Sequence, residues 1–168
     1  NMLYLILRDY GGAKKLPKPS EPREVPSAAV CRAKDMKYYG SFDEFSKDFP
    51  FDDKKPVIAL LYYGHIYPMD YSGAVAVIAE RLQRYANVLP IAVSGMDSLN
   101  DGKLKKLLTG FLPKKPELVM NCMSFRLSAG PMGGNISAGT DLLKELNVPY
   151  LHPFFMSRRT EKDWIDSV

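Results

Sequence analysis

The sequence predicts an α/β fold: a four-stranded, parallel, doubly wound sheet with helices on both faces. Two observations support this prediction. Apolar runs, each of the length of one strand, recur at residues 56–63, 87–93, 117–123 and 148–155. Segments with helical periodicity separate these runs, and such segments supply the crossovers that parallel strands need.

Before the sheet, residues 3–10 (LYLILRDY) are mostly apolar and end at Gly11 and Gly12, which is typical of the end of a helix. From Gly12 to Pro26 the composition changes to Lys, Pro, Ser and Glu, so this segment is expected to be an extended linker. We therefore divide the chain into residues 1–26, a helix end with its linker, and residues 27–168, an α/β domain.

A short helix is expected after Ser41, because Ser41 and Glu44 have the spacing of a capping box. Three phenylalanines follow at helical spacing, and this stripe suits packing better than ligand binding. Residues 56–63 (PVIALLYY) are continuously apolar, as expected for a parallel strand covered on both faces. Apolar residues on one helical face then lead to the second strand, 87–93 (NVLPIAV).

Pro90 cannot donate to a strand ladder, so the second strand is placed at a sheet edge. Asp101 can begin the next helix, and 117–123 (ELVMNCM) is the third strand. Thr140 or Asp141 begins a third helix, before the fourth strand at 148–155 (VPYLHPFF). The connections predict right-handed crossovers and a flavodoxin-like strand order, 2-1-3-4.

Composition excludes several classes of protein. The net charge is only +4, and the lysines are spread through loops without interleaved aromatics, which argues against a nucleic-acid partner. Cys31 and Cys122 belong to no metal-binding spacing, which indicates a reducing, cytoplasmic location. No apolar run approaches about 18 residues, so no membrane span is expected. Asn1 before Met2 indicates an internal start or a tag remnant, and the helix begun at Thr160 is unfinished at Val168.

Ligands of open α/β sheets bind beyond the carboxyl ends of the strands. His65 and Asp70 follow the first predicted strand, and His152 lies in the fourth. The connection after the third strand contains Arg126 and a glycine-rich stretch with Gly130, Gly133 and Gly134. Both histidines of the chain are therefore expected at one edge of the sheet.

Each of these residues also has a structural interpretation. His65 can hydrogen-bond the backbone of its own turn, and Asp70 can cap the helix that begins near Ser72. His152 can simply complete its strand before Pro153. The glycine-rich stretch matches neither a P-loop nor a dinucleotide-binding fingerprint, although glycines allow a backbone to approach a flat ligand closely.

Several segments, in their order along the chain, resemble the large subunits of cobaltochelatases and magnesium chelatases. They are AVCRAKDMKYYGSFDEFSKDF, GHIYPMD, AVAVIAERLQRYANVLPIAVSG, ELVMNCMSF and LKELNVPYLHPF with TEKDWIDS. The resemblance spans nearly all 168 residues, and it implies a short strand followed by a helix within residues 27–50.

The sequence also departs from the family pattern. Tyr63 and Gly64 precede His65 where the family usually has Arg and Ser. Cys31-Arg32-Ala33 stands where Tyr-His-Pro is frequent, so one family histidine is missing. The family's acidic segment follows the helix begun at Thr160 and lies beyond Val168.

The resemblance implies ATP-dependent insertion of cobalt or magnesium into a tetrapyrrole, in cobalamin or chlorophyll-type biosynthesis. ATP would be hydrolysed by separate AAA-type motor subunits, in line with the lack of a Walker A sequence here. His65 would accept a proton or transiently bind the metal ion, imidazole being suited to Co²⁺ and a carboxylate to Mg²⁺, with Asp70 as its partner. The three glycines and His152 would contact the macrocycle, and Arg126 would bind an acidic side chain. The 168 residues alone would be inactive.

Two other functions remain open from the residues. The missing histidine and the missing acidic segment favour a non-catalytic module that docks a partner or an anionic ligand. A flavodoxin-like nucleotide binder is a third hypothesis, because fold alone does not determine function.

Overall fold

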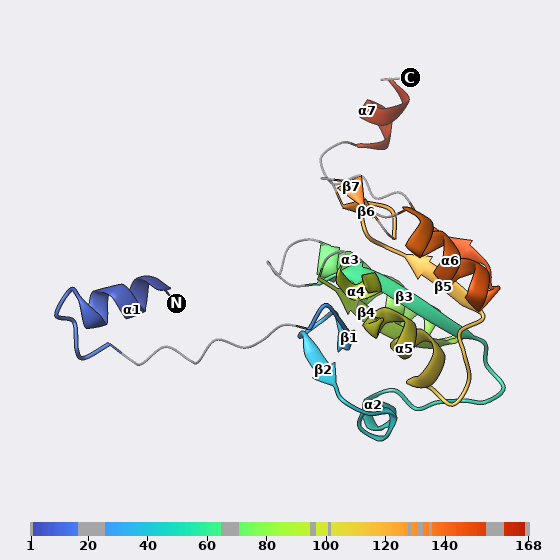
Figure 1. Ribbon diagram of the computed structural model, residues 1–168, viewed down its shortest axis with the longest axis horizontal. Helices are drawn as coiled ribbons and strands as arrows, with labels where there is room; N and C mark the ends of the chain where they lie inside the picture. The colour runs from blue at the N-terminus through green and yellow to red at the C-terminus, as the bar shows by residue number, and fades with distance from the viewer. Residues whose placement is uncertain are drawn as a thin grey trace.

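The computed structural model describes residues 2–16, 26–64, 71–94, 97–100, 102–127, 129–130, 133–134, 136–153 and 160–166. Figure 1 shows the arrangement of their helices and strands. The helices are α1 (Met2–Asp9), α2 (Phe42–Asp48), α3 (Tyr71–Leu82), α4 (Asp97–Asn100), α5 (Lys103–Gly110), α6 (Ile136–Leu146) and α7 (Glu161–Ile165). The strands are β1 (Ala28–Arg32), β2 (Lys37–Tyr39), β3 (Val57–Tyr63), β4 (Asn87–Val93), β5 (Leu118–Asn121), β6 (Ala129–Gly130), β7 (Gly133–Gly134) and β8 (Tyr150–Leu151).

The main sheet has six strands in the order β2-β1-β4-β3-β5-β8. The prediction of a four-stranded, parallel, flavodoxin-like sheet is therefore wrong, although the fold is α/β. Strands β4, β3, β5 and β8 run parallel to one another, but β1 pairs antiparallel with both β4 and β2. The chain thus forms a mixed sheet, in which a hairpin extends the parallel part.

The short strand expected within residues 27–50 is β1, but Pro90 explains why its pairing with β4 was missed. Its lack of an N–H favoured a sheet edge for 87–93, but β4 lies inside the sheet. The antiparallel ladder pairs Ala28–Val30 of β1 with Ile91–Val93 of β4 and stops before Pro90. The proline is tolerated because the ladder with β1 does not need its missing donor. The hydroxyl of Tyr62 in β3 donates to the carbonyl of Cys31 over 2.9 Å and further ties β1 to the sheet.

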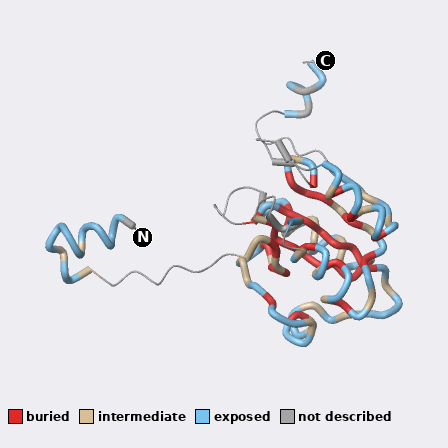
Figure 2. The backbone as a smooth tube through the Cα atoms, in the orientation of Figure 1, coloured by how far each residue is buried: buried red, intermediate tan, exposed pale blue. Residues whose placement is uncertain are grey.

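Helices cover both faces of the sheet, which explains why β3 is continuously apolar. On one face, residues of α2, α5 and α6 pack on the odd-numbered residues of β3; the buried members include Phe45, Leu104, Leu108, Leu142 and Leu146. On the other face, Val75 of α3 packs on Leu60 and Tyr62. Figure 2 shows that the buried residues concentrate in the strands.

The helix prediction after Ser41 is confirmed, since the Ser41 side chain accepts from the backbone N–H of Glu44 at the start of α2. The helix predicted from Thr140 or Asp141 begins earlier, at Ile136. The fourth strand pairs with β5 only through Tyr150 and Leu151. Helix α4 and the small β6–β7 hairpin were not predicted.

Residues 2–9 form α1, which Figure 1 draws apart from the sheet. Its large apolar side chains are exposed: Leu3, Tyr4, Leu5, Ile6 and Leu7. Most of the predicted linker, residues 17–25, lies outside the described residues. None of the described helices has the length and apolar character that crossing a membrane requires.

Candidate functional site at the carboxyl edge of the sheet

The helices that follow β3 and β5 pack on opposite faces of the sheet. The loop after β3 leads to α3, which packs on one face, whereas the chain after β5 leads to α6, which packs on the other. Because β3 and β5 are neighbours in the sheet and lead to helices on opposite faces, the topology of the chain diverges at the carboxyl edge between these two strands (Figure 1). Ligands of open α/β sheets bind at such a divergence.

Tyr63 ends β3 at this edge. Its side chain is 42% exposed, although the other residues on the same face of β3 are buried. The ring packs edge-on against Phe125, which follows β5, with 5.5 Å between ring centroids and 77° between the planes. The two diverging connections therefore begin with a mutual aromatic contact.

Gly64 follows Tyr63 where the chain still lies close to β4. Its N–H donates to the carbonyl of Val93 over 3.2 Å. A Cβ atom at this position would lie 2.7 Å from the Cβ of Ala92, well inside van der Waals contact. A residue without a side chain is therefore required for β3 to leave the sheet along this path.

Asn121 organises the start of the loop after β5. Its side chain is fully buried. The amide nitrogen donates to the carbonyl of Phe125 over 3.1 Å and to the hydroxyl of Tyr150 over 2.8 Å. The amide oxygen accepts from the N–H of Met123 over 3.0 Å. Both donors of one buried amide are thus used, and residues 121–125 fold around it.

β8 holds the same loop from the neighbouring strand position. Burial raises the pKa of the Tyr150 hydroxyl, while its hydrogen bond with Asn121 acts in the opposite direction. Nε2 of His152 lies 2.8 Å from the carbonyl oxygen of Met123, so the protonated nitrogen donates to it. The hydrogen bonds of Tyr150 with Asn121 and of His152 with Met123 therefore link β8 and the residue after it to the loop of residues 121–127.

The structure brings together part of the predicted site. Arg126 is exposed in the loop that Asn121 and His152 hold. Gly130 and Gly133 pair in the β6–β7 hairpin, and Gly134 pairs with Ala129. His65 and Asp70, the two residues predicted to act in catalysis, lie outside the described residues.

Within the described part of the chain, no three His, Cys, Asp or Glu residues are grouped in a way that could hold a metal ion. The two cysteines are buried and free. Burial raises the pKa of Cys122 to about 11, and burial also raises that of Cys31. Both side chains therefore remain neutral thiols near neutral pH, and neither is a ready thiolate ligand.

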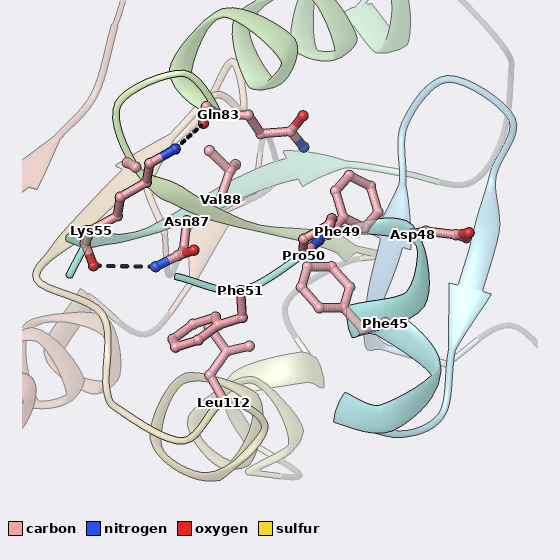
Figure 3. Close-up of a pocket in the computed structure, with 11 residues that line it drawn as sticks. Phe45, Asp48, Phe49, Pro50, Phe51, Lys55, Gln83, Asn87, Val88 and Leu112 are labelled. Atoms are coloured by element: carbon pink, nitrogen blue, oxygen red, sulfur yellow. Dashed lines mark hydrogen bonds between the residues drawn. The ribbon is translucent and has the colours of Figure 1, made fainter. Parts of the chain in front are cut away.

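A separate hollow of about 150 Å³ lies at the opposite, amino edge of the parallel strands. Figure 3 shows the rings of Phe45 and Phe49 on one side of it and Lys55 and Asn87 on the other. The Asn87 amide is fully engaged with the backbone of Asp52 and Lys55. Ligand pockets usually enclose about 300–1,000 Å³. This hollow is smaller than that and is best explained as a packing gap beside the aromatic cluster.

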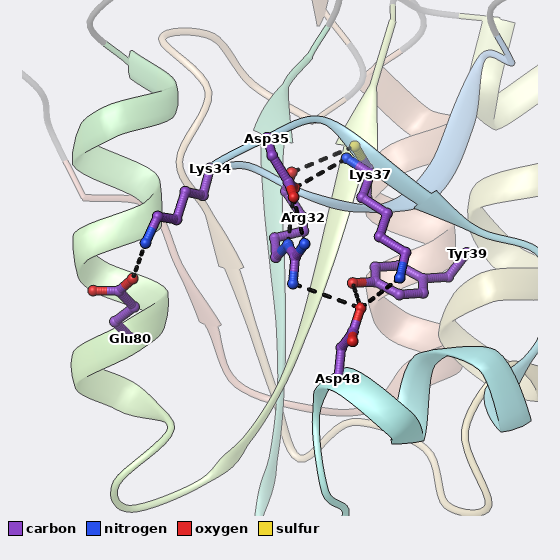
Figure 4. A network of polar contacts seen from close by, with 8 residues as sticks. Arg32, Lys34, Asp35, Lys37, Tyr39, Asp48 and Glu80 are labelled. Carbon is purple, nitrogen blue, oxygen red and sulfur yellow. Dashed lines mark hydrogen bonds and ion pairs between the residues drawn. The ribbon is translucent and has the colours of Figure 1, made fainter.

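The β1–β2 hairpin carries a polar network around Arg32 and Asp48 (Figure 4). Arg32 forms an ion pair with Asp35, and Nη1 of Arg32 lies 3.5 Å from Asp48. Asp48 also accepts from Lys37 over 2.6 Å and from Tyr39 over 2.7 Å. Lys37 and then Tyr39 lower the pKa of Asp48, and Arg32 lowers that of Asp35. Both carboxylates are thus ionised and paired, so the network fastens the hairpin to α2.

Comparison with known protein families gives a match to CobN/Magnesium Chelatase over residues 1–168. The chain belongs to the CobN/magnesium chelatase family. The resemblance inferred from the segments quoted above is therefore confirmed.

Similar curated proteins include an uncharacterized protein of Methanocaldococcus jannaschii, 30% identical over 136 residues. They also include the chloroplastic magnesium-chelatase subunit ChlH of Oryza sativa, in subspecies indica and japonica, each 31% identical over 119 residues. These matches cover 76% of the chain for the archaeal protein and 69% for the rice subunits. The chain spans only 11% of the length of the archaeal relative and 8% of that of the rice subunits.

Sequence reasoning missed the residues that shape this edge. Asn121 and Tyr150 were treated only as parts of strands, Tyr63 as a departure from the family pattern, and Phe125 only as part of a segment that carries the resemblance. One signal was available for Asn121: a polar amide that ends an apolar strand must find hydrogen-bond partners when it is buried.

Proposed function

We propose that this chain forms part of the tetrapyrrole-binding region of a large chelatase subunit, which inserts cobalt or magnesium into the macrocycle. The observation that supports this proposal most directly is the loop after β5. In a chain of the CobN/magnesium chelatase family, this loop holds an aromatic and a basic side chain at the divergence between β3 and β5. A tetrapyrrole combines a flat apolar ring with acidic or amide side chains, so it needs contacts of both kinds.

The proposed roles of the site residues follow from their chemistry. Arg126 would bind a carboxylate of the macrocycle, because its planar guanidinium matches that group in a bidentate geometry. The β6–β7 hairpin, with Gly130, Gly133 and Gly134, would lie against the ring, because a backbone without side chains can approach it closely. His152 would contact the macrocycle at the edge of the same site, while its Nε2 stays hydrogen-bonded to the carbonyl of Met123.

Metal insertion also requires that the pyrrole N–H protons leave the macrocycle. We propose His65 as the proton acceptor or transient metal ligand, and Asp70 as the group that orients it, since imidazole exchanges protons near neutral pH. The metal ion, Co²⁺ or Mg²⁺, is a substrate of this reaction. ATP would act on AAA-type partner subunits of the complex, in the cytoplasm.

One observation favours a second candidate, a module that docks a partner without catalysis. Arg32, which by the segment resemblance stands where the family frequently has a histidine, is engaged with Asp35 and Asp48. In this second candidate, the chain supports assembly of the complex and does not take part in proton transfer.

The two candidates are separated by metal insertion in the full-length protein with its partner subunits. His65→Ala should lower the insertion rate by about 10²-fold or more if His65 transfers a proton. Asp70→Asn should reduce it less if the carboxylate only orients the imidazole. Insertion at the wild-type rate by His65→Ala would refute the catalytic role and favour the docking module. Parallel titrations with hydrogenobyrinic diamide, protoporphyrin and FMN test the ligand class.

A further inference from the structure

We propose that Tyr63 and Phe125 form an aromatic contact surface for one flat face of the macrocycle, with Asn121 and Tyr150 as positioning residues. This inference rests on the proposed function, and it assigns to the site four residues that the family comparison and the glycine and histidine patterns leave without a role. The contact surface consists of the exposed part of the Tyr63 ring and the Phe125 ring against it.

The first support is position. Tyr63 is the last residue of β3 and Phe125 lies just after β5, so the pair spans the divergence of the two connections. Tyr63 lies on the face of β3 that carries Ala59 and Leu61, both fully buried. Because Tyr63 is 42% exposed, this face of β3 becomes accessible to a ligand at its last residue, at the carboxyl edge of the sheet.

The second support is that the pair is held in place from the core. Phe125 packs against the hydrophobic core, and its backbone carbonyl accepts from the buried Asn121 amide over 3.1 Å. Tyr150 accepts from the same amide over 2.8 Å. A contact surface whose conformation is already fixed loses little entropy when a ligand binds, and this strengthens binding.

The third support is the chemistry around the pair. Gly64 follows Tyr63 directly, and the β6–β7 hairpin contributes Gly130, Gly133 and Gly134, so the backbone at these four positions can approach a flat ring closely. Aromatic rings interact favourably with such a ring in stacked or edge-on geometry. Arg126 follows Phe125 and is exposed, so it can reach an acidic substituent at the rim of the ring.

The test compares Tyr63→Ala with Tyr85→Ala in the full-length protein. Tyr85 is a matched control, because it is 76% exposed but lies between α3 and β4, near the amino edge of the sheet. Binding of a metal-free tetrapyrrole is followed by its absorbance and by quenching of its fluorescence. Losing one aromatic contact should raise the Kd about three- to tenfold in Tyr63→Ala. Tyr85→Ala should bind within about twofold of the wild type, by the same measure.

Two further variants separate ring contact from folding. Tyr63→Phe keeps the ring and should bind like the wild type. Phe125→Leu keeps most of the apolar volume but removes the ring, and it should weaken binding as Tyr63→Ala does. In steady-state insertion, KM should rise while kcat stays near the wild-type value, because the contact is made equally in the ground state and the transition state.

The outcomes distinguish this inference from the function on which it rests. If the wild type binds the tetrapyrrole but Tyr63→Ala and Phe125→Leu bind it equally well, the aromatic surface is refuted and the proposed function stands. If the wild type binds no tetrapyrrole, the proposed function fails and the inference fails with it. Equal weakening by Tyr63→Ala and Tyr85→Ala would indicate a general loss of stability and would also refute the assignment.

Discussion

Replacing Asn121 by alanine should destabilise the fold more than its single side chain suggests. The substitution removes three hydrogen bonds, and it leaves the carbonyl of Phe125, the N–H of Met123 and the hydroxyl of Tyr150 without that partner. A net contribution of about 1 kcal/mol for each bond gives a loss of about 3 kcal/mol in the free energy of unfolding. Asn121 and its hydrogen bond with Met123 are buried, so water cannot replace that bond, whereas the bonds to Phe125 and Tyr150 are only partly buried.

Urea unfolding of the 168-residue chain, followed by circular dichroism, measures this loss. Tyr150→Phe removes the hydroxyl, which bonds Asn121 and the backbone of Leu127, and should cost about 1 kcal/mol for each bond lost. Asn100→Ala is the matched control, since Asn100 is exposed at the end of α4, and it should change stability by about 0.5 kcal/mol at most. A loss below about 0.5 kcal/mol in Asn121→Ala would refute the view that this amide organises the loop.

Three more predictions concern the hairpin, the exit of β3 and the linker. Because the pKa of Asp48 is lowered in the folded state, the carboxylate stabilises the fold fully above the ordinary aspartate pKa, and this stabilisation is lost as the pH falls through the lowered pKa. Asp48→Asn should therefore make the melting temperature fall less steeply toward acid pH. Gly64→Ala should destabilise the chain by about 1–3 kcal/mol in urea, because the new Cβ would overlap Ala92. Deleting residues 12–22 should leave the melting temperature unchanged, if that segment is a linker.

Each of these has a matched control or a contradicting result. Asp43→Asn is the control for Asp48→Asn, because Asp43 lies in the first turn of the same helix, α2. In the thermal unfolding series, the acid limb of Asp43→Asn should stay closer to that of the wild type. Gly64→Ala combined with Ala92→Gly should recover part of the lost stability, and no recovery would contradict the proposed overlap. A melting temperature that falls by several degrees after the deletion would mean that residues 12–22 pack on the sheet.

The strands with local signals were predictable, and those that depend on distant partners were not. Residues 56–63 are continuously apolar because helices cover both faces of β3, and this pattern is visible in the sequence. β1 pairs with a strand about sixty residues later, and its short sequence AAVCR carries no comparable pattern. Pro90 then led to a wrong position for β4, because a missing N–H does no harm inside a sheet when the neighbouring strand does not pair at that residue. The ladder of β1 with β4 stops at Ile91.

The predicted start of α6 was also wrong, because a local sequence signal did not decide it. Thr140 looks like a helix cap, but its hydroxyl donates to the carbonyl of Ile136 one turn earlier, so it lies inside α6. The residues that shape the candidate site meet only after folding, since Asn121 and Tyr150 are 29 positions apart. The sequence did place His152 and Arg126 on one edge, because carboxyl ends of parallel strands share an edge.

Hydrogen–deuterium exchange of the full-length protein, with and without a metal-free tetrapyrrole, tests the central claim most directly. If the carboxyl edge binds the macrocycle, amides of residues 121–127 and of the β6–β7 hairpin should exchange more slowly with the ligand present. Residues 49–55 and 83–87, at the amino edge, should exchange at unchanged rates, and FMN should give no protection at either edge. Protection confined to the amino edge, or equal protection by FMN, would contradict the claim that this edge is a tetrapyrrole site.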